Sequence, residues 1–328
     1  MSRALGFILA YHRIAAPGFD PQRLRVTPEH FSQQLQVLRS RATPCSLQDL
    51  ALSSSAPGTP PRVAVTLDDG YADAWLAGAP LLQAAAIPAT IFVTTGAIGD
   101  PALFWWDVLE RSLFEPRRLP AVLELRQGER VESFEFGGDQ EQEIPVAARA
   151  WNVDDARDPT PRHRAYRRLH AILGAAPAAQ RRDLLDAICH WAGVPTAPPP
   201  GQGPLTTEQL QSLARSPGIE IGAHTQGHVR LSALSARAQH KEMTSSRSVL
   251  HAILDRPPRS MAYPYGAPRD ISRMTAWLAR AAGYELACLG VGGAVRAPVR
   301  RWALPRILAP DLGAAEFEHW LDVLFKAS

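Results

Sequence analysis

Short apolar stretches rich in β-branched residues alternate along the chain with longer stretches in which apolar residues recur every three or four positions. The first pattern predicts strands buried on both faces, and the second predicts amphipathic helices. The predicted strands are residues 6–11, 63–67, 89–94, 219–222, 260–263, 284–289 and 304–308. The predicted helices are residues 27–40, 79–86, 206–215, 235–254, 270–282 and 314–325, the first opened by Thr27 and Pro28.

Strands that alternate with helices form a parallel sheet covered by helices. Six or seven such units favour a barrel, so the expected fold class is α/β, a distorted (β/α)7-type barrel with a mainly helical insertion. The insertion covers residues 101–204, from the aromatic segment LFWWDVLE to the Pro- and Gly-rich segment TAPPPGQGP, and it includes a candidate strand pair and Arg-rich helices. We therefore interpret residues 1–328 as one domain and 101–204 as an insertion subdomain within it.

Polar residues follow the predicted strands where they end. In a (β/α) barrel, the chemistry takes place at this C-terminal edge of the strands. The residues in these positions are His12, Asp68, Asp69, His224, the segment 263–265 (Tyr-Pro-Tyr) and Arg306. Their common position predicts a single functional site.

The segment VAVTLDDGYADAW places Asp68 and Asp69 side by side, directly before a glycine. A turn explains one of the aspartates, but each carboxylate raises the cost of ionising the other, so a positive partner is expected nearby. HTQGH places His224 and His228 four residues apart after another strand. A chance pair is the usual explanation of HxxxH alone, but two imidazoles and one carboxylate are a common ligand set for catalytic zinc.

The net charge, the cysteine spacing and the length of the apolar stretches argue against several classes of protein. The net charge of +3 does not indicate a nucleic-acid-binding surface. The three cysteines lack CxxC spacing, which argues against a disulfide framework or a cysteine zinc site. No stretch approaches ~18 apolar residues, so no membrane span is predicted. The opening MSRALGFILAYHRI is interpreted as a strand rather than a signal peptide, so a cytoplasmic location is expected.

The segments TLDDGYAD, HTQGHVRLSAL and AYPYG resemble, in the same order, the TFDDG, H-S/T-xxx-H and R-x-P-Y motifs of the polysaccharide deacetylases (carbohydrate esterase family 4, the NodB-homology domain). YHRI and LPRI are similar to the branch that includes poly-N-acetylglucosamine deacetylases. The resemblance implies a metal-dependent hydrolase that removes the N-acetyl group from an amino sugar of a glycan or glycan precursor. Metal-bound water would be the nucleophile.

The resemblance also implies roles for individual residues. Asp69, His224 and His228 would hold a divalent metal, with Zn2+ expected and Co2+, Mn2+ or Ni2+ as alternatives. Asp68 would be the general base, and the backbone N–H of Tyr265 would complete the oxyanion site. His12 would be the acid that protonates the departing amine, in place of the family's late L-x-x-H histidine. A core or turn histidine is the alternative interpretation of His12.

The arginine of R-x-P-Y is missing, since Met261 or Ala262 stands at its position. Arg306 could steady the base from a neighbouring strand end, or it could form a surface salt bridge. Trp105 and Trp106 could stack on sugar rings, or they could pack at a domain junction. Tyr265, Arg306, Trp105 and Trp106 are the candidate substrate-binding residues.

Three other functions share parts of these patterns. Two histidines and a carboxylate also bind Fe(II) in oxygenases, but those usually have a jelly-roll fold and would leave Asp68 unused. A catalytically silent carbohydrate-binding relative and an amidohydrolase acting on a non-sugar amide are the remaining alternatives. The expected partner is an N-acetylated carbohydrate, and whether it is a polymer, a lipid-linked sugar or a small glycoside stays open.

Overall fold

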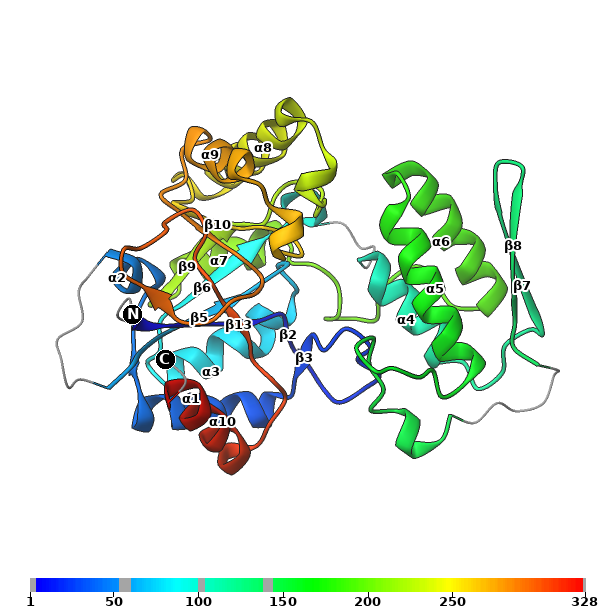
Figure 1. Cartoon of the computed structure of the whole chain (residues 1–328), viewed down its shortest axis with the longest axis horizontal. Coiled ribbons are helices and arrows are strands. Elements are labelled where there is room, and N and C mark those ends of the chain that lie inside the picture. The colour runs from blue at the N-terminus through cyan, green and yellow to red at the C-terminus, as the bar shows by residue number, and fades with distance from the viewer. Residues whose placement is uncertain (1–3, 53–59, 100–103, 138–143, 327–328) are drawn as a thin grey trace. The chain divides into compact units, whose positions relative to one another are not determined.

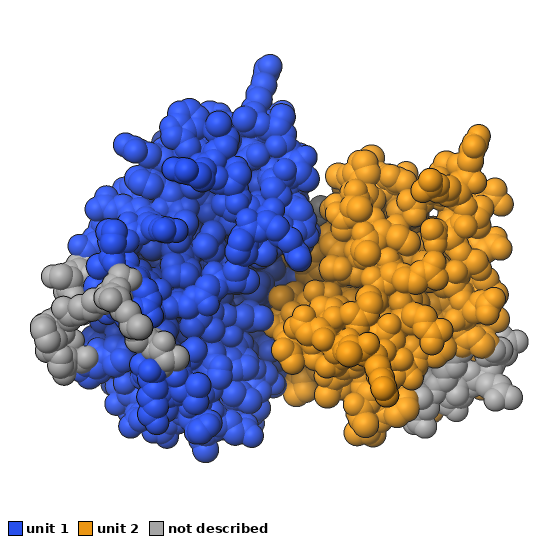
Figure 2. Space-filling model, viewed as in Figure 1, with its two compact units in different colours: residues 1–16, 25–100, 204–328 blue, residues 17–24, 101–203 orange. Residues whose placement is uncertain are grey.

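The structure is a computed structural model that describes residues 4–52, 60–99, 104–137 and 144–326 (Figure 1). The chain divides into two compact units, coloured separately in Figure 2. Unit 1 comprises Met1–Ala16, Arg25–Asp100 and Pro204–Ser328, and unit 2 comprises Pro17–Leu24 and Pro101–Gly203. The longer segment of unit 2, Pro101–Gly203, falls within the residues expected as an insertion, 101–204. Unit 2 also includes the short segment 17–24, which the sequence did not predict.

Unit 1 is built on parallel strands that close into a ring. Following the pairing, these are β1 (Ala4–Tyr11), β5 (Arg62–Leu67), β6 (Ala89–Val93), β9 (Ile219–Ala223), β10 (Ser260–Ala262) and β11 (Leu286–Cys288). The last strand, β13 (Ile307–Leu308), pairs with β1, and Leu304 just before it bridges to Cys288 of β11. Residues 304–308 therefore contact both edges of the curled sheet, and the expected distorted barrel is confirmed.

Four short strands complete unit 1. β12 (Val295–Arg296) lies antiparallel to β1, and β4 (Thr43–Pro44) lies parallel to β5. β2 (Arg13–Ile14) and β3 (Arg25–Val26) form a separate parallel pair directly after the end of β1. β2 begins at Arg13, so the β2–β3 pair fixes the backbone directly after His12.

Four helices of unit 1 begin at a capping side chain, among them the predicted Thr27. The side chains of Thr27, Thr206, Ser235 and Ser272 each accept a hydrogen bond from a backbone N–H of the first turn. The helices are α1 (Pro28–Arg41), α2 (Leu47–Leu52), α3 (Ala79–Ala84), α7 (Thr207–Arg215), α8 (Ala236–Leu254), α9 (Arg273–Ala281) and α10 (Ala314–Lys326). A π-helical turn, Ala74–Gly78, precedes α3, and 3-10 turns occur at Thr95–Ala97, Leu231–Ala233 and Pro268–Asp270.

Alternate residues of each strand face two different parts of the core. One set, including Leu9, Val65 and Ile91, packs with the apolar faces of the helices. The other set, including Ile8 and Phe92, forms a smaller apolar cluster that we interpret as the barrel interior. Side chains are packed tightly there, since a Cβ atom at Gly222 would lie 2.4 Å from the Phe92 ring. Because both faces of the strands are buried, they are apolar without alternation in the sequence.

Unit 2 contains α4 (Trp105–Phe114), α5 (Pro161–Ala175), α6 (Ala178–Ala192) and the 3-10 turn Val146–Ala148. The antiparallel hairpin of β7 (Val122–Gln127) and β8 (Arg130–Glu135) turns at Gly128, whose φ is +63°. The predicted strand pair and Arg-rich helices are therefore present. Across the described part of the chain, no helix combines the length and the apolar character that crossing a membrane requires.

Candidate metal centre and active site

The two adjacent aspartates lie in a tight turn after β5. The backbone N–H of Asp68 donates to the carbonyl of Tyr11 (2.9 Å), which continues the pairing of β5 with β1. Asp69 has a φ of +71°, and its carbonyl accepts a hydrogen bond from the N–H of Thr94 (3.0 Å). This left-handed conformation ends the strand. The carboxylate of Asp69 contacts two histidines, whereas that of Asp68 contacts an arginine.

Asp69 lies beside both predicted histidine ligands. One of its carboxylate oxygens, Oδ1, is 3.4 Å from Nε2 of His224 and 3.2 Å from Nε2 of His228. Asp69 and His224 are each 2% exposed, and the candidate ligand atoms of all three residues lie within 4.8 Å of one another. The structure thus brings together the predicted ligands from the ends of β5 and β9.

These residues fit a metal ion. The Nδ1 atom of His224 lies 2.9 Å from the carbonyl oxygen of Ala262, so Nδ1 carries the proton and the Nε2 lone pair faces Asp69. Oδ1 of Asp69 is buried and accepts no hydrogen bond from the described residues. Ligand atoms about 2.0–2.2 Å from a tetrahedral zinc ion lie roughly 3.3 Å apart. The Asp69–histidine separations match that spacing.

The protonation states of the candidate ligands also favour a metal site. Burial would raise the pKa of Asp69, but protons on the facing Nε2 atoms of His224 and His228 outweigh it and hold that pKa well below its ordinary value. A bound cation would take the place of those protons. Burial lowers the pKa of His228. An ionised carboxylate and a neutral imidazole are the forms that bind metals.

Asp68 is held by Arg306. Burial would raise the pKa of Asp68, but the charge of Arg306 outweighs it, so this pKa is lowered. The guanidinium donates from Nη1 to Oδ1 (2.6 Å) and from Nη2 to Oδ2 (2.5 Å). It also donates to the carbonyl of Leu289 (2.6 Å) and to the hydroxyl of Thr66 (3.1 Å). Arg306 is 1% exposed, so its ion pair with Asp68 is buried, and the alternative interpretation of Arg306 as part of a surface salt bridge is wrong. The same burial disfavours direct contact between Arg306 and a substrate.

His12 follows β1, next to the strand that carries the aspartates. Its imidazole is close enough for its charge to lower the pKa values of both Asp68 and Asp69. Its Nδ1 atom is buried without a hydrogen-bond partner among the described residues. His319, the other candidate acid, is exposed on α10. Of these two histidines, His12 is therefore the one that lies near the two aspartates.

Tyr265 lies in the turn after β10, with a φ of +62°. Its ring centroid is 5.1 Å from that of His228, and the guanidinium carbon of Arg230 lies 4.5 Å from the Tyr265 ring centroid. Arg230 in turn pairs with the buried Asp270. The Tyr265 turn therefore lies beside His228, one of the candidate metal ligands.

Trp105 and Trp106 lie in α4 of unit 2 and are 7% and 6% exposed. The Trp106 ring stacks on Phe104, with centroids 4.7 Å apart, and the Trp105 ring lies 4.7 Å from that of His170. Both indole rings are therefore used in packing, which favours the structural interpretation over sugar stacking.

Two features that border the site were not predicted from the sequence. Arg13, next to His12, forms a buried pair with Asp73 at 3.1 Å between Nε and Oδ2. Glu242 of α8 accepts hydrogen bonds from two backbone N–H groups of the loop between His224 and His228. Arg13 and Asp73 lie in the quoted segments YHRI and TLDDGYAD, and Glu242 lies in the predicted helix 235–254. No spacing rule distinguishes these three residues from ordinary surface charges.

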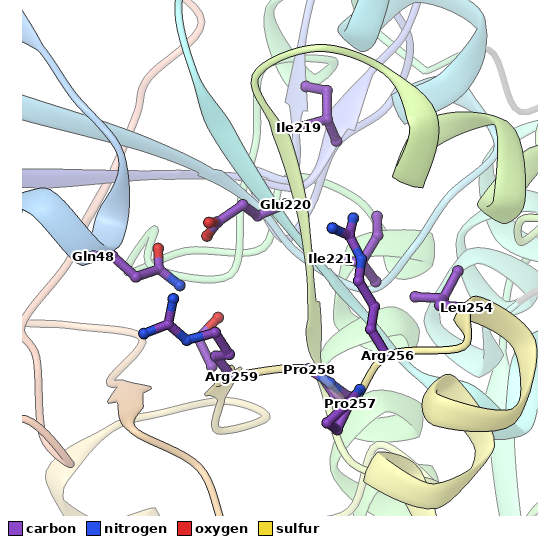
Figure 3. A pocket seen from close by; sticks show the side chains of 10 residues that line it. Gln48, Ile219, Glu220, Ile221, Leu254, Arg256, Pro257, Pro258 and Arg259 are labelled. Atoms are coloured by element: carbon purple, nitrogen blue, oxygen red, sulfur yellow. The ribbon is translucent and has the colours of Figure 1, made fainter.

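A small cavity of about 110 Å3 lies at the other end of the strands (Figure 3). Its lining includes Glu220 and Ser260, near the beginnings of β9 and β10, together with Gln48 and Arg259. Since His224 follows the end of β9, this cavity is separate from the candidate metal centre.

A family model and a known protein both match the sequence of this chain. A family model described as polysaccharide deacetylase matches residues 55–117 and 188–287, which include Asp68, Asp69, His224 and His228. YxkH of Bacillus subtilis (strain 168) is 26% identical over 119 residues, which span 36% of this chain and only 41% of that protein.

Two solved structures share the fold over nearly the whole chain. The Streptococcus pyogenes deacetylase PplD, in complex with acetate, is 19% identical with a TM-score of 0.59, and 99% of each chain is covered. IcaB from Ammonifex degensii is 17% identical with a TM-score of 0.56, and 97% of each chain is covered. With the matched family model and the motifs at the strand ends, we conclude that this chain belongs to the polysaccharide deacetylase family.

Proposed function

We propose that the protein is a metal-dependent carbohydrate N-deacetylase that hydrolyses the N-acetyl group of an amino sugar. One observation carries this proposal. Oδ1 of Asp69 faces the Nε2 atoms of His224 and His228 at 3.4 and 3.2 Å, while both oxygens of the neighbouring carboxylate, Asp68, are bound by Arg306. Two adjacent carboxylates thus have two different environments, which is the arrangement that separate roles in catalysis need.

Asp69, His224 and His228 would hold the divalent cation, with Zn2+ expected. When bound, the cation would act as a Lewis acid and lower the pKa of a water molecule toward about 7. The remaining steps require a proton acceptor and a proton donor from the chain itself.

Asp68 would accept the proton from the attacking water. Arg306 occupies one lone pair on each of its oxygens, while an ionised carboxylate has about four acceptor positions. Asp68 therefore keeps acceptor capacity while both its oxygens are fixed in place. Fixing the base in this way lowers the entropy that must be lost in the transition state.

His12 would donate a proton to the departing amine. An alkyl amine is a poor leaving group unless it is protonated as the C–N bond breaks. The position of His12 at the end of β1, beside the strand that carries Asp68, supports this assignment. The Tyr265 turn would provide the backbone N–H that stabilises the oxyanion.

The test combines metal analysis with acetate release. Zinc-loaded protein is assayed against N-acetylglucosamine oligomers, nucleotide sugars and lipid-linked N-acetyl sugars. The variant His224→Ala/His228→Ala is expected to lose both metal and activity, whereas His251→Ala, at an exposed position on α8, is the matched control and should lose neither.

Two results would contradict the proposal separately. Metal bound at wild-type stoichiometry in the double variant would contradict the ligand assignment. A metal-loaded wild-type protein that releases acetate from none of the amino sugars would contradict the substrate class, and release from a non-sugar amide would then identify the alternative amidohydrolase.

A further inference from the structure

The loop between the two histidine ligands has an unfavourable backbone conformation. Thr225 has a φ of +62° and His228 has a φ of +48°. Residues other than glycine rarely adopt this left-handed region, and β-branched threonine is among the least suited to it. The loop therefore needs contacts from outside to keep its shape.

One side of the loop is held by the segment after β6. The N–H of Thr95 donates to the carbonyl of Thr225 (3.1 Å), and the N–H of Gly96 donates to the carbonyl of Gln226 (2.8 Å). The approach at Gly96 is so close that a Cβ atom there would lie 2.5 Å from the Gln226 oxygen. These contacts fix the carbonyl groups of the loop but not its N–H groups.

The other side of the loop is held by a single side chain. Oε2 of Glu242 accepts hydrogen bonds from the N–H of Gln226 (3.0 Å) and from the N–H of Gly227 (2.8 Å). Bonds from an N–H to an ionised carboxylate are stronger than those to a neutral acceptor. Peptide groups of the loop are thus bonded on both sides.

Glu242 is itself well placed to act as an anchor. It lies in α8, where the next residue, Met243, is fully buried and its carbonyl accepts a hydrogen bond from the Tyr284 hydroxyl (2.9 Å). The backbone of α8 is therefore fixed by the core at the point from which the Glu242 side chain reaches the loop.

We propose that Glu242 is a positioning residue for the metal centre, holding the loop so that His224 and His228 both face Asp69. This inference rests on the proposed function, because the positioned groups are the proposed metal ligands. Removing the carboxylate releases two N–H groups of the loop, and the left-handed residues on either side can then relax. The arrangement of the two imidazoles, and not the stability of the barrel, is what should change.

The test measures zinc affinity in the metal-depleted protein by competition with a chelating dye. Substitution of groups that orient metal ligands typically weakens binding about 10–100-fold. Glu242→Ala is expected to raise the zinc Kd within that range. Glu242→Gln should raise it less, because its amide oxygen can still accept both bonds. Lys241→Ala, at the exposed neighbouring position on the same helix, is the control and should leave the Kd unchanged.

Two further measurements separate positioning from a general loss of stability. The metal-free Glu242→Ala variant should melt close to the wild-type temperature, and the absorption spectrum of its Co2+ form should differ from wild type because the ligand geometry has changed. A zinc Kd and a Co2+ spectrum that equal those of wild type would overturn the inference. If instead wild type and the His224→Ala/His228→Ala variant bind zinc equally, the proposed metal site fails and Glu242 has no ligands to position.

Discussion

Removing Asp73 should destabilise the protein strongly, because it removes a buried carboxylate that binds the buried guanidinium of Arg13. The Arg13 and Asp73 side chains are 2% and 8% exposed. The second carboxylate oxygen accepts a hydrogen bond from the backbone N–H of Ile14 (3.3 Å), and the Arg13 guanidinium lies 4.5 Å from the Tyr71 ring centroid. This pair links the end of β1, next to His12, to the turn that carries the aspartates.

The size of the effect follows from burial. Breaking a buried ion pair by removing one partner costs about 3–5 kcal/mol, because the remaining charge loses an interaction that offset its desolvation. For a folding unit of roughly 150–250 residues, 1 kcal/mol lowers Tm by about 2–4 °C. Asp73→Ala should therefore lower Tm by roughly 6–20 °C. The pKa of Asp73 is raised, because the effect of burial exceeds the opposing effect of Arg13. The desolvation of the ionised carboxylate is therefore not fully offset in the intact pair.

That cost predicts a rescue. Replacing both partners, as in Arg13→Met/Asp73→Leu, removes the buried charges together and should recover most of the stability. Unfolding is followed in denaturant on metal-free protein, so that metal binding does not contribute. Glu285→Ala is the control, since it breaks a half-exposed pair with Arg259 and should cost less than about 1 kcal/mol. The reasoning is refuted if Asp73→Ala costs no more than Glu285→Ala, or if the double variant is less stable than Asp73→Ala.

The remaining predictions concern catalysis, with bound metal measured in each variant. Asp68→Asn should keep the metal but lower kcat by about 10²–10⁴-fold, because an amide cannot accept the proton; near-normal acetate release would show that Asp68 is not the base. Arg306→Lys should also keep the metal and lower kcat by about 10²-fold, since an ammonium cannot bind both oxygens of Asp68 at once; unchanged kcat would contradict its positioning role. His12→Ala should lower kcat on an N-acetyl sugar by about 10²-fold while largely sparing an aryl acetate, whose leaving group departs without protonation. Equal losses on both substrates, or loss of metal, would contradict the assignment of His12 as the acid.

The secondary structure of the barrel was predictable because each element satisfies local rules. The helix at α1 has a capping threonine followed by proline, and β5 consists mainly of β-branched and apolar residues. Short elements such as β2, β3 and α2 were missed, since a few residues show no periodicity. The assignment of residues 17–24 to unit 2 was also not predictable, because it depends on packing between distant segments.

The candidate site was predictable where its residues form contiguous motifs. Asp68 and Asp69 are adjacent, and His224 and His228 are four residues apart, so each pattern is visible within one segment. The partners that hold those residues are different. Glu242 reaches the loop between the histidines from a helix, and its only sequence signal is an ordinary charge on a helical surface. Such a contact depends on where α8 packs, which the local pattern does not encode.

Arg306 binds Asp68 from a different strand end than the one where the motif arginine was expected. The position expected to carry the arginine lies in β10, whereas Arg306 directly precedes β13, which pairs with β1 and completes the ring. Strands distant in sequence direct their ends toward the same space in a closed sheet, so a long guanidinium side chain can reach Asp68 from more than one of them. Its bonds to Leu289 and Thr66 connect the segment after β11 with β5. The residue that orients the proposed base therefore also ties together the two sides of the closing segment, so closure of the barrel and placement of Asp68 depend on the same contacts.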